Sequence, residues 1–345
     1  MFMTPDSGAV SRRGFLRQSF AFSALTALES FSPLSSLAAD RAAAHLLMLG
    51  DWGDENPAAQ SMVAAAMRGY SKEHALGPQA LLLLGDSWYG ELASGVRSPR
   101  WQTQFEEMYP PDAFPCPAYS IAGNHDYQLW PDSKVAAELE YARVGRTSTG
   151  PTRWTMPSLW YRFAFPTKNP LITFLALDSN MPFADGSASH GRNFTLTEEQ
   201  RSEQLAWLKT ELERTRTTPF LVVMGHHPIY SNGPHGDHPV LVRDWEPLFR
   251  KHKVDLYLAG HDHDLQHLEF EGHPTTFFIS GGGGADLYNL KIDPSERGPY
   301  AQKVNGFSHL AVTHEKMTLQ HIDGNGRSLH AFTKTSAGRV EIRNS

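Results

Sequence analysis

The chain has 345 residues, of which 40% are hydrophobic and 11% aromatic, so it can bury a large core, and wholesale disorder is excluded. Its 31 basic and 37 acidic residues give a net charge of −6, which offers a nucleic-acid partner no electrostatic support. The single cysteine, Cys116, excludes an internal disulfide framework, a cysteine-ligated zinc site and an iron–sulfur cluster. A tight metal site would therefore use His, Asp, Asn or Tyr, and nine of the 17 histidines lie between His226 and His273. Length alone allows two domains or one large one.

The amino-terminal segment has the three parts of an export signal. Paired arginines, Arg12 and Arg13, precede an apolar run over 20–28 and small residues over 36–39. The paired arginines resemble twin-arginine signals, which implies a bacterial protein exported already folded. The apolar run is too short to span a bilayer, so we expect no stable membrane insertion. We predict that residues 1–38 form a cleaved signal read by the twin-arginine export machinery, and that the product is periplasmic or secreted.

Five short apolar runs, each ending in glycine and a polar residue, predict buried strands in a sheet that is covered on both faces. In chain order the runs are Leu46–Leu49, Leu81–Leu84, Tyr119–Ala122, Phe220–Met224 and Leu256–Ala259.

The clearest predicted helix runs from Glu198 to about Arg214. Thr197 and Gln200 form a capping box before it, and leucines recur at helical spacing. After His273 the pattern changes to alternating or branched runs, which predict an antiparallel sheet with no intervening helix. These runs are Thr275–Ser280, His309–His314, Thr318–Ile322 and Leu329–Thr333. The pattern as a whole indicates one α/β domain of mixed sheets flanked by helices.

Each of the five predicted strands is followed by residues that can bind a metal. They are Asp51, Asp86 with Tyr89, Asn124 with His125, His226, and His261 with His263. In open α/β sheets, ligands bind at the carboxyl ends of strands. Carboxylate, phenolate, amide oxygen and imidazole together favour iron, manganese or zinc over calcium. Each of these sites alone is a weak signal, since a Gly-Asp pair at a strand end is usually an ordinary turn. The two imidazoles of His261 and His263 are a stronger signal, and the recurrence of such residues after five strands predicts a metal site.

The sequence around these positions resembles the signature blocks of the purple acid phosphatases, within the calcineurin-like metallophosphoesterases. The blocks are Asp51, Gly85–Tyr89, Gly123–Asp126, Val223–His226 and Gly260–His263. A tyrosine three residues after the second aspartate marks this branch, and the flanking residues resemble the small, tartrate-resistant type. The resemblance covers roughly residues 46–283. It implies a four-layer αββα sandwich of mixed β-sheets, with residues 39–345 as a single metallophosphoesterase catalytic domain.

Carried over residue by residue, the resemblance implies a binuclear centre in which Asp86 is shared by two ions. The ferric ion would be held by Asp51, Asp86, Tyr89 and His263, and the divalent ion by Asp86, Asn124, His226 and His261. A phenolate and two carboxylates suit the more acidic trivalent ion, whereas amide and imidazole suit a divalent one. The divalent ion is left open among iron, zinc and manganese.

The implied activity is hydrolysis of small phosphate monoesters by an acid phosphatase. The binuclear centre would activate a metal-bound hydroxide for in-line attack on phosphorus. His125 resembles the family histidine near the leaving oxygen, and His235 is either a phosphate contact, a second acid or a solvated loop residue. One alternative is a phosphodiesterase or nucleotidase on the same centre. Another is a non-catalytic protein that binds phosphate or metal; no stable protein partner is expected.

The remaining candidates have supporting roles. We expect His227 to orient its loop, Gly281–Gly284 to pack closely under the site, and Cys116 to be a buried small hydrophobe. Asp126 and Asp178 could hydrogen-bond imidazoles of the site. The other histidines of the cluster, which are His238, His252, His267 and His273, are assigned to the surface or to positions behind the ligands.

Overall fold

A computed structural model of the chain describes residues 43–128, 134–147, 150–181 and 195–343. The predicted export signal, residues 1–38, lies outside the described residues. The described residues all belong to one compact unit.

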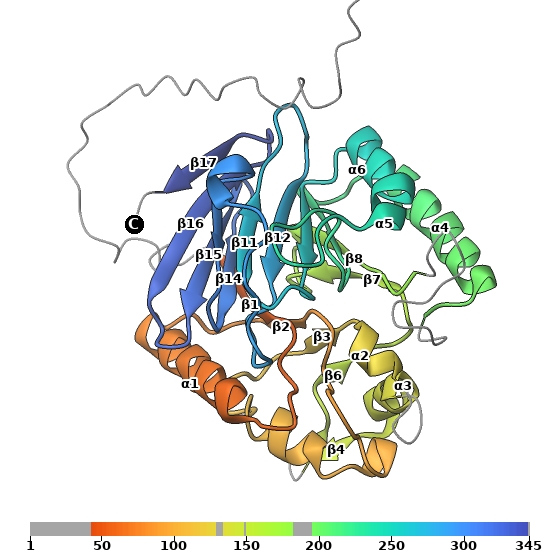
Figure 1. Ribbon diagram of the computed structural model, residues 1–345, viewed down its shortest axis with the longest axis vertical. Helices are drawn as coiled ribbons and strands as arrows, with labels where there is room; N and C mark the ends of the chain where they lie inside the picture. Colours follow the sequence, from red (N-terminus) through yellow and green to blue (C-terminus); the bar gives the residue numbers. More distant parts are fainter. Residues whose placement is uncertain (1–42, 129–133, 148–149, 182–194, 344–345) are drawn as a thin grey trace, which may run out of the picture. The chain divides into compact units, whose positions relative to one another are not determined.

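Two large mixed sheets and one small ribbon make up the strands of the described chain (Figure 1). The first sheet has the order β17-β16-β15-β14-β1-β2-β3-β6, and the second has the order β13-β11-β12-β10-β9-β8-β7. The strands of the first are β1 (Ala44–Leu49), β2 (Ala80–Leu83), β3 (Ala118–Ser120), β6 (Trp154–Thr155), β14 (Gly306–Val312), β15 (Lys316–Asp323), β16 (Ser328–Thr335) and β17 (Val340–Arg343). Those of the second are β7 (Tyr161–Phe165), β8 (Ile172–Ala176), β9 (Phe220–Met224), β10 (Leu256–Ala259), β11 (Leu265–Leu268), β12 (Thr276–Ser280) and β13 (Tyr300–Gln302). The ribbon pairs β4 (Arg146–Thr147) with β5 (Gly150–Pro151).

Helices lie between the strands in the chain. They are α1 (Ala58–Glu73), α2 (Asn124–Tyr127), α3 (Lys134–Val144), α4 (Glu198–Glu213), α5 (Pro239–Asp244) and α6 (Glu246–His252). Figure 1 shows α1 on one side of the sheets and α4, α5 and α6 on the other.

Side-chain alternation along the strands produces three apolar cores and therefore four layers. In β1, Leu46 and Met48 point into the core between the two sheets, whereas Leu47 and Leu49 pack with α1 and α3. The third core joins the second sheet to α4, α5 and α6 through side chains such as Leu208. The αββα sandwich implied by the resemblance is confirmed.

The predicted helix after residue 197 is also confirmed. In α4 the Thr197 hydroxyl accepts a hydrogen bond from the Gln200 backbone N–H (3.1 Å), and the Gln200 side chain accepts from Thr197 N–H (2.9 Å). Leu208 and Leu212 are buried, whereas Leu205 is only partly buried.

The prediction of a single antiparallel sheet after His273 is wrong for one strand. The later runs do form antiparallel pairs, as β14, β15, β16 and β17. The first run, β12, instead belongs to the other sheet, where it is parallel to β10 and antiparallel to β11. A fully buried apolar run has no period-2 signal that would identify its pairing partner. The short helical turn Pro294–Glu296 also interrupts this part of the chain.

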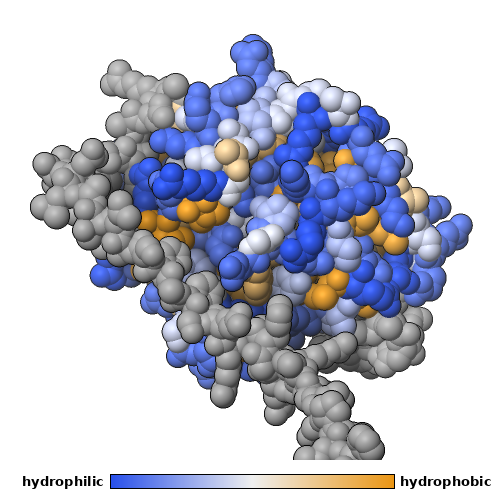
Figure 2. Space-filling view, turned by 90° about the horizontal axis from the view of Figure 1, so that it is seen from above, coloured by the Kyte–Doolittle hydropathy of each residue, from blue (hydrophilic) through white to orange (hydrophobic). Residues whose placement is uncertain are grey.

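The described surface is mostly polar. Figure 2 shows one face, on which hydrophobic residues form small separate patches among hydrophilic ones. The large hydrophobic residues that are exposed in the described chain are Met62, Val144 and Ile342. None of the helices among the described residues has the length and apolar character to cross a bilayer.

Several histidines that are not metal-ligand candidates are buried in contact with one another. His267 was expected at the surface or behind the ligands, but it is fully buried and contacts His330 at 2.9 Å. Burial, together with His45, lowers the pKa of His309 to about 3, and burial with His267 lowers that of His330 to about 3. Both imidazoles are therefore neutral in the folded protein across the mildly acidic range.

These low pKa values predict that acid destabilises the fold. An unfolded histidine titrates near pH 6.5, so below that pH the unfolded chain binds more protons and the free energy of unfolding falls. At pH 4.5 each such histidine costs roughly 2–3 kcal/mol of stability. Urea denaturation of metal-free protein between pH 7 and 4 measures this, and His330→Gln should flatten the dependence. The exposed His314→Gln is the control, and an unchanged slope in His330→Gln would contradict the expectation.

Candidate metal centre

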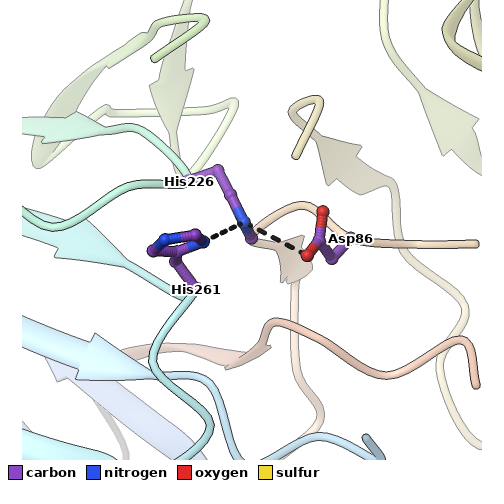
Figure 3. A group of neighbouring side chains, drawn as sticks. All are labelled: Asp86, His226 and His261. Atoms are coloured by element: carbon purple, nitrogen blue, oxygen red, sulfur yellow. Dashed lines mark hydrogen bonds and ion pairs between the residues drawn. The ribbon is translucent and has the colours of Figure 1, made fainter. Parts of the chain in front are cut away.

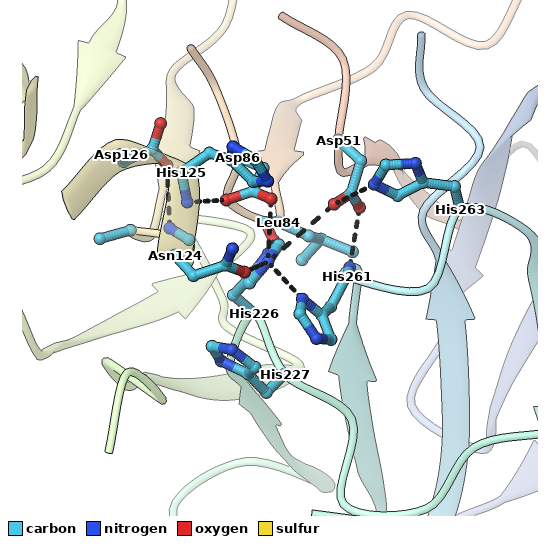
Figure 4. Close-up of polar contacts among 12 residues, drawn as sticks. Asp51, Leu84, Asp86, Asn124, His125, Asp126, His226, His227, His261 and His263 are labelled. Atoms are coloured by element: carbon cyan, nitrogen blue, oxygen red, sulfur yellow. Dashed lines mark hydrogen bonds and ion pairs between the residues drawn. The ribbon is translucent and has the colours of Figure 1, made fainter. Parts of the chain in front are cut away.

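The parallel strands of both sheets bring their carboxyl ends to one edge. β1, β2 and β3 run parallel in the first sheet, and β9 and β10 run parallel in the second. Each of the predicted metal-ligand positions follows one of these strands: Asp51 after β1, Asp86 and Tyr89 after β2, Asn124 after β3, His226 after β9, and His261 and His263 after β10. The structure brings all seven side chains together. Figure 4 shows them with the exception of Tyr89.

One group of donors surrounds the Tyr89 phenol. Its hydroxyl lies 3.2 Å from Asp51 Oδ1, 3.0 Å from Asp86 Oδ2 and 2.9 Å from His263 Nε2. His263 Nε2 is itself 3.5 Å from Asp51 Oδ1. Ligand atoms of Asp51, Asp86 and His263 all lie within 4.8 Å of one another.

A second group surrounds His226 and shares Asp86 with the first (Figure 3). His226 Nε2 lies 3.2 Å from Asn124 Oδ1, 3.4 Å from Asp86 Oδ2 and 3.3 Å from His261 Nδ1. Ligand atoms of Asp86, His226 and His261 again lie within 4.8 Å of one another. The two groups are the sets that the resemblance implied, with the Asp86 carboxylate common to both.

Backbone acceptors orient the imidazoles of this cluster. His226 Nδ1 lies 2.8 Å from the Leu84 carbonyl oxygen, and His263 Nδ1 contacts that of Asp286. A carbonyl only accepts, so each Nδ1 donates its hydrogen there and each Nε2 faces the cluster. These second contacts fix the tautomer that a metal needs.

The electrostatics of the cluster favour a bound cation. Asp51, Asp86 and His226 are at most 1% exposed. Burial raises the pKa of Tyr89, and the Asp86 and Asp51 carboxylates raise it further, to well above its ordinary value. Burial opposes the charge on His226, but Asp86 and Asp51 raise the pKa of its imidazole to about 10. Two buried carboxylates beside a phenol need compensating positive charge, and metal ions supply it.

The chemistry of the donors fits two unlike ions. Tyr89 and the carboxylates of Asp51 and Asp86 give the first group anionic oxygens, which suit a more acidic ion. Asn124, His226 and His261 give the second group neutral donors, which suit a divalent ion.

Three of the ligand candidates have a left-handed backbone. The φ angles are 59° at Asp51, 51° at Asp86 and 71° at His261. Such conformations cost of order 1–3 kcal/mol each for non-glycine residues and persist where the surroundings impose them. The backbone N–H of His261 donates to Asp51 Oδ2 (2.8 Å), and that of His125 donates to Asp86 Oδ1 (2.8 Å). The ligand loops thus hold one another, a feature the sequence pattern did not indicate.

Gly85 is required by close packing at the centre. Its φ is 87°, and a Cβ there would lie 2.6 Å from His226 Nδ1 and 2.9 Å from the Gly123 nitrogen. We expect Gly85→Ala to displace His226 and to weaken metal binding by about 10- to 100-fold, as for lost support of a ligand. Isothermal titration of metal-free protein measures this. Gly77→Ala, also at positive φ but with open space around it, is the control. Equal affinities in the two variants would show that Gly85 has no role at the centre.

Both catalytic candidates face a cavity of about 470 Å³ over the cluster. The His125 ring contacts that of Tyr89 in a tilted arrangement, with ring centroids 4.2 Å apart, and its Nδ1 lies 3.2 Å from Gln128 Oε1. His235 Nδ1 lies 2.7 Å from Asp262 Oδ1, so the carboxylate accepts a hydrogen bond from this nitrogen. In both rings the Nε2 atom is therefore available to contact a substrate.

The cavity also contains a residue that the sequence analysis missed. Tyr288 lines it and stacks on His263, with ring centroids 4.0 Å apart. Asp262 was likewise not singled out, although it lies between two ligand candidates and orients His235. No spacing rule connects residue 288 to the earlier motifs; only its position soon after the glycine run could have suggested a role.

Other expectations have mixed outcomes. Asp126 and Asp178 contact no imidazole of the site: Asp126 accepts from backbone N–H groups, and Asp178 accepts from the Tyr127 hydroxyl. These buried carboxylates accept hydrogen bonds from other groups: Asp126 from its own loop and the loop after β2, and Asp178 from Tyr127 and Asn180. His227 does orient its loop, through Ser179, and Cys116 is buried.

The glycine run of 281–284 packs as expected. A Cβ on Gly283 would clash with the Gly50 backbone beneath the centre.

Two donor groups that share a carboxylate, at the edge of an αββα sandwich, are typical of binuclear metallophosphoesterases. Comparison with known proteins agrees. The calcineurin-like phosphoesterase family profile matches residues 44–265, and the chain belongs to that family.

Its relatives include acid phosphatases. It is 30% identical to tartrate-resistant acid phosphatase type 5 of Oryctolagus cuniculus, over 81% of this chain and 87% of that one. It is also 30% identical to purple acid phosphatase 7 of Arabidopsis thaliana, over 84% of this chain and 86% of that one.

Solved structures share the fold. A purple acid phosphatase from yellow lupin (Lupinus luteus) seeds superposes with a TM-score of 0.62 at 15% identity, over 85% of this chain and 54% of that one. GAP50, described as the anchor in the inner membrane complex of Plasmodium, superposes with a TM-score of 0.70 at 20% identity, over 84% and 88%. An anchor and a phosphatase share this fold, so the fold alone does not define an activity.

Proposed function

We propose that this chain is an acid phosphatase that hydrolyses phosphate monoesters at a binuclear metal centre. The observation that carries the proposal is the pair of donor groups meeting at Asp86, whose ligand atoms lie within 4.8 Å of one another. Family membership and the acid phosphatase relatives support it.

The proposed ligand sets follow the two groups. Asp51, Tyr89 and His263 would hold a ferric ion together with Asp86, and Asn124, His226 and His261 would hold a divalent ion together with Asp86. The divalent ion is iron, zinc or manganese. Bound there, the ions supply Lewis acidity that activates water and stabilises charge on the phosphoryl oxygens.

The two cavity histidines act on the substrate. With Nδ1 on Gln128, His125 presents Nε2 to the cavity and donates a proton to the leaving oxygen, a role typically worth ~10²–10⁴-fold in rate. Asp262 keeps the proton on Nδ1 of His235, whose Nε2 contacts the phosphate or serves as a second acid. Tyr288 forms part of the wall around the leaving group.

A pair of matched substrates tests the proposal. Metal-loaded protein should hydrolyse an aryl phosphate monoester at least about 10-fold faster, by kcat/KM, than the corresponding bis-aryl diester. Equal or faster diester hydrolysis would establish the phosphodiesterase or nucleotidase alternative. Hydrolysis of neither ester by protein with full metal content would establish a non-catalytic binding protein.

We also propose that the protein reaches the periplasm or the exterior through twin-arginine export. The tripartite pattern over residues 1–38 supports this. In a bacterial host, replacing Arg12 and Arg13 with lysine should retain the precursor in the cytoplasm. Unchanged export of that variant would exclude the twin-arginine route.

A further inference from the structure

One carboxylate behind the centre holds two ligand loops together. Asp126, at the start of α2, accepts hydrogen bonds from the backbone N–H groups of Ser87 (3.2 Å), Trp88 (3.0 Å) and Gly123 (2.8 Å). The first two belong to the loop that carries Asp86 and Tyr89. The third precedes Asn124 in the other loop, and Figure 4 shows Asp126 lying beside Asn124 and His125. The spacing of the two loops therefore depends on how firmly Asp126 is held.

Helix α3 supports this clamp from behind. Lys134, in its first turn, is buried, and its Nζ donates to the carbonyl oxygens of Trp88 (2.6 Å) and Gly90 (3.0 Å), on either side of Tyr89. Glu138 lies one helical turn later, on the same face of α3, and is 0% exposed.

An ionised Glu138 carboxylate would need hydrogen-bond donors, and its surroundings supply none. Both carboxyl oxygens are buried, and neither accepts a hydrogen bond from a donor group of the described chain. The Lys134 ammonium is already directed at two carbonyl oxygens. A buried ionised carboxylate without partners is strongly unfavourable, whereas a protonated one can donate to a neighbouring carboxylate. Burial, the charge of Asp126 and a side-chain hydrogen bond between Glu138 and Asp126 raise the pKa of Glu138 well above its ordinary value, which agrees with the protonated form.

We propose that Glu138 is a positioning residue that donates a hydrogen bond to Asp126 and so fixes the spacing of the two ligand loops. The proposal deepens the proposed function, on which it rests, because the loops matter through the metal ions they hold. Glu138 acts through Asp126 and the three backbone N–H groups whose hydrogen bonds Asp126 accepts.

Two substitutions test whether Glu138 acts as a hydrogen-bond donor or as a negative charge. Glu138→Gln keeps the shape and an N–H donor, so it should bind Zn²⁺ or Mn²⁺ within about 3-fold of the unchanged protein. Glu138→Leu removes the hydrogen bond to Asp126. It should weaken metal binding by about 10- to 100-fold, which is the usual effect of losing a residue that supports a metal ligand. Glu140→Leu on the same helix, where Glu140 pairs with Arg143 at the surface, is the matched control and should change neither property.

The second measurement needs no bound metal. Hydrogen–deuterium exchange of metal-free, full-length protein should be faster in the segments 84–90 and 121–128 of Glu138→Leu, and unchanged there in Glu138→Gln and Glu140→Leu. A general loss of stability would instead speed exchange in all segments, including β14–β16. That comparison distinguishes positioning from a merely structural role.

Each outcome decides the proposal. Wild-type exchange and metal affinity in Glu138→Leu would overturn it, and so would a Glu138→Gln variant as impaired as Glu138→Leu, since that would mark an ionised partner of Lys134. If Glu138→Leu does not fold, the Gln variant decides alone: wild-type behaviour supports the donor role, and impaired behaviour overturns it. If the unchanged protein binds no metal, the proposed function fails while the exchange comparison still tests the clamp.

Discussion

Asp86→Asn should nearly abolish hydrolysis of phosphate monoesters. Asp86 is the one side chain common to both donor groups, and replacing its carboxylate by an amide removes an anionic donor from each. If the ions supply several kcal/mol of transition-state stabilisation, losing about 4 kcal/mol slows the reaction about 10³-fold. Asparagine has nearly the same size and shape as aspartate, so the variant should keep the fold.

Steady-state kinetics with an aryl monoester and metal analysis of the same samples measure this effect. Asp237→Asn is the matched control, because Asp237 also lines the cavity but pairs with Arg297 rather than with the ligand candidates. That variant should stay within a few-fold of the unchanged enzyme. Full activity in Asp86→Asn would remove Asp86 from the centre.

Tyr89→Phe should remove the visible colour of the iron-loaded protein. The Tyr89 hydroxyl lies 2.9–3.2 Å from three other ligand atoms, so its phenolate would be bound to the ferric ion, and a ferric tyrosinate absorbs visible light. Phenylalanine keeps the ring and its contact with the His125 ring while it removes the oxygen. We also expect weaker retention of the ferric ion.

Absorption spectra of iron-loaded variants measure the colour. Tyr288→Phe is the control, since Tyr288 stacks on His263 at the same cavity without contributing an oxygen to either donor group, and it should remain coloured. A Tyr89→Phe protein that keeps the band would mean that another group produces it.

The ligand candidates could be predicted because each follows a strand with a recognisable pattern. Apolar runs ending in glycine mark where β1, β2, β3, β9 and β10 stop, and parallel strands necessarily bring those ends to one edge. The seven positions that the structure brings together are therefore those that the sequence indicated.

Features that depend on contacts between distant segments could not be predicted. The placement of β12 depends on its parallel pairing with β10, and an all-apolar strand carries no sign of that partner. The left-handed backbone of Asp86 and the clamp made by Asp126 depend on loops that meet only in the folded chain. Glu138 would be read from its sequence as a surface residue of α3, because nothing local indicates that it is buried.

Metal content and visible spectrum, recorded together on the active protein, test the binuclear centre most directly. The account predicts two metal ions per chain, at least one of them iron, a visible absorption band, and activity that is lost with a chelator and regained with metal. A protein that hydrolyses monoesters fully with one ion or none, or that is colourless at full iron content, would contradict it.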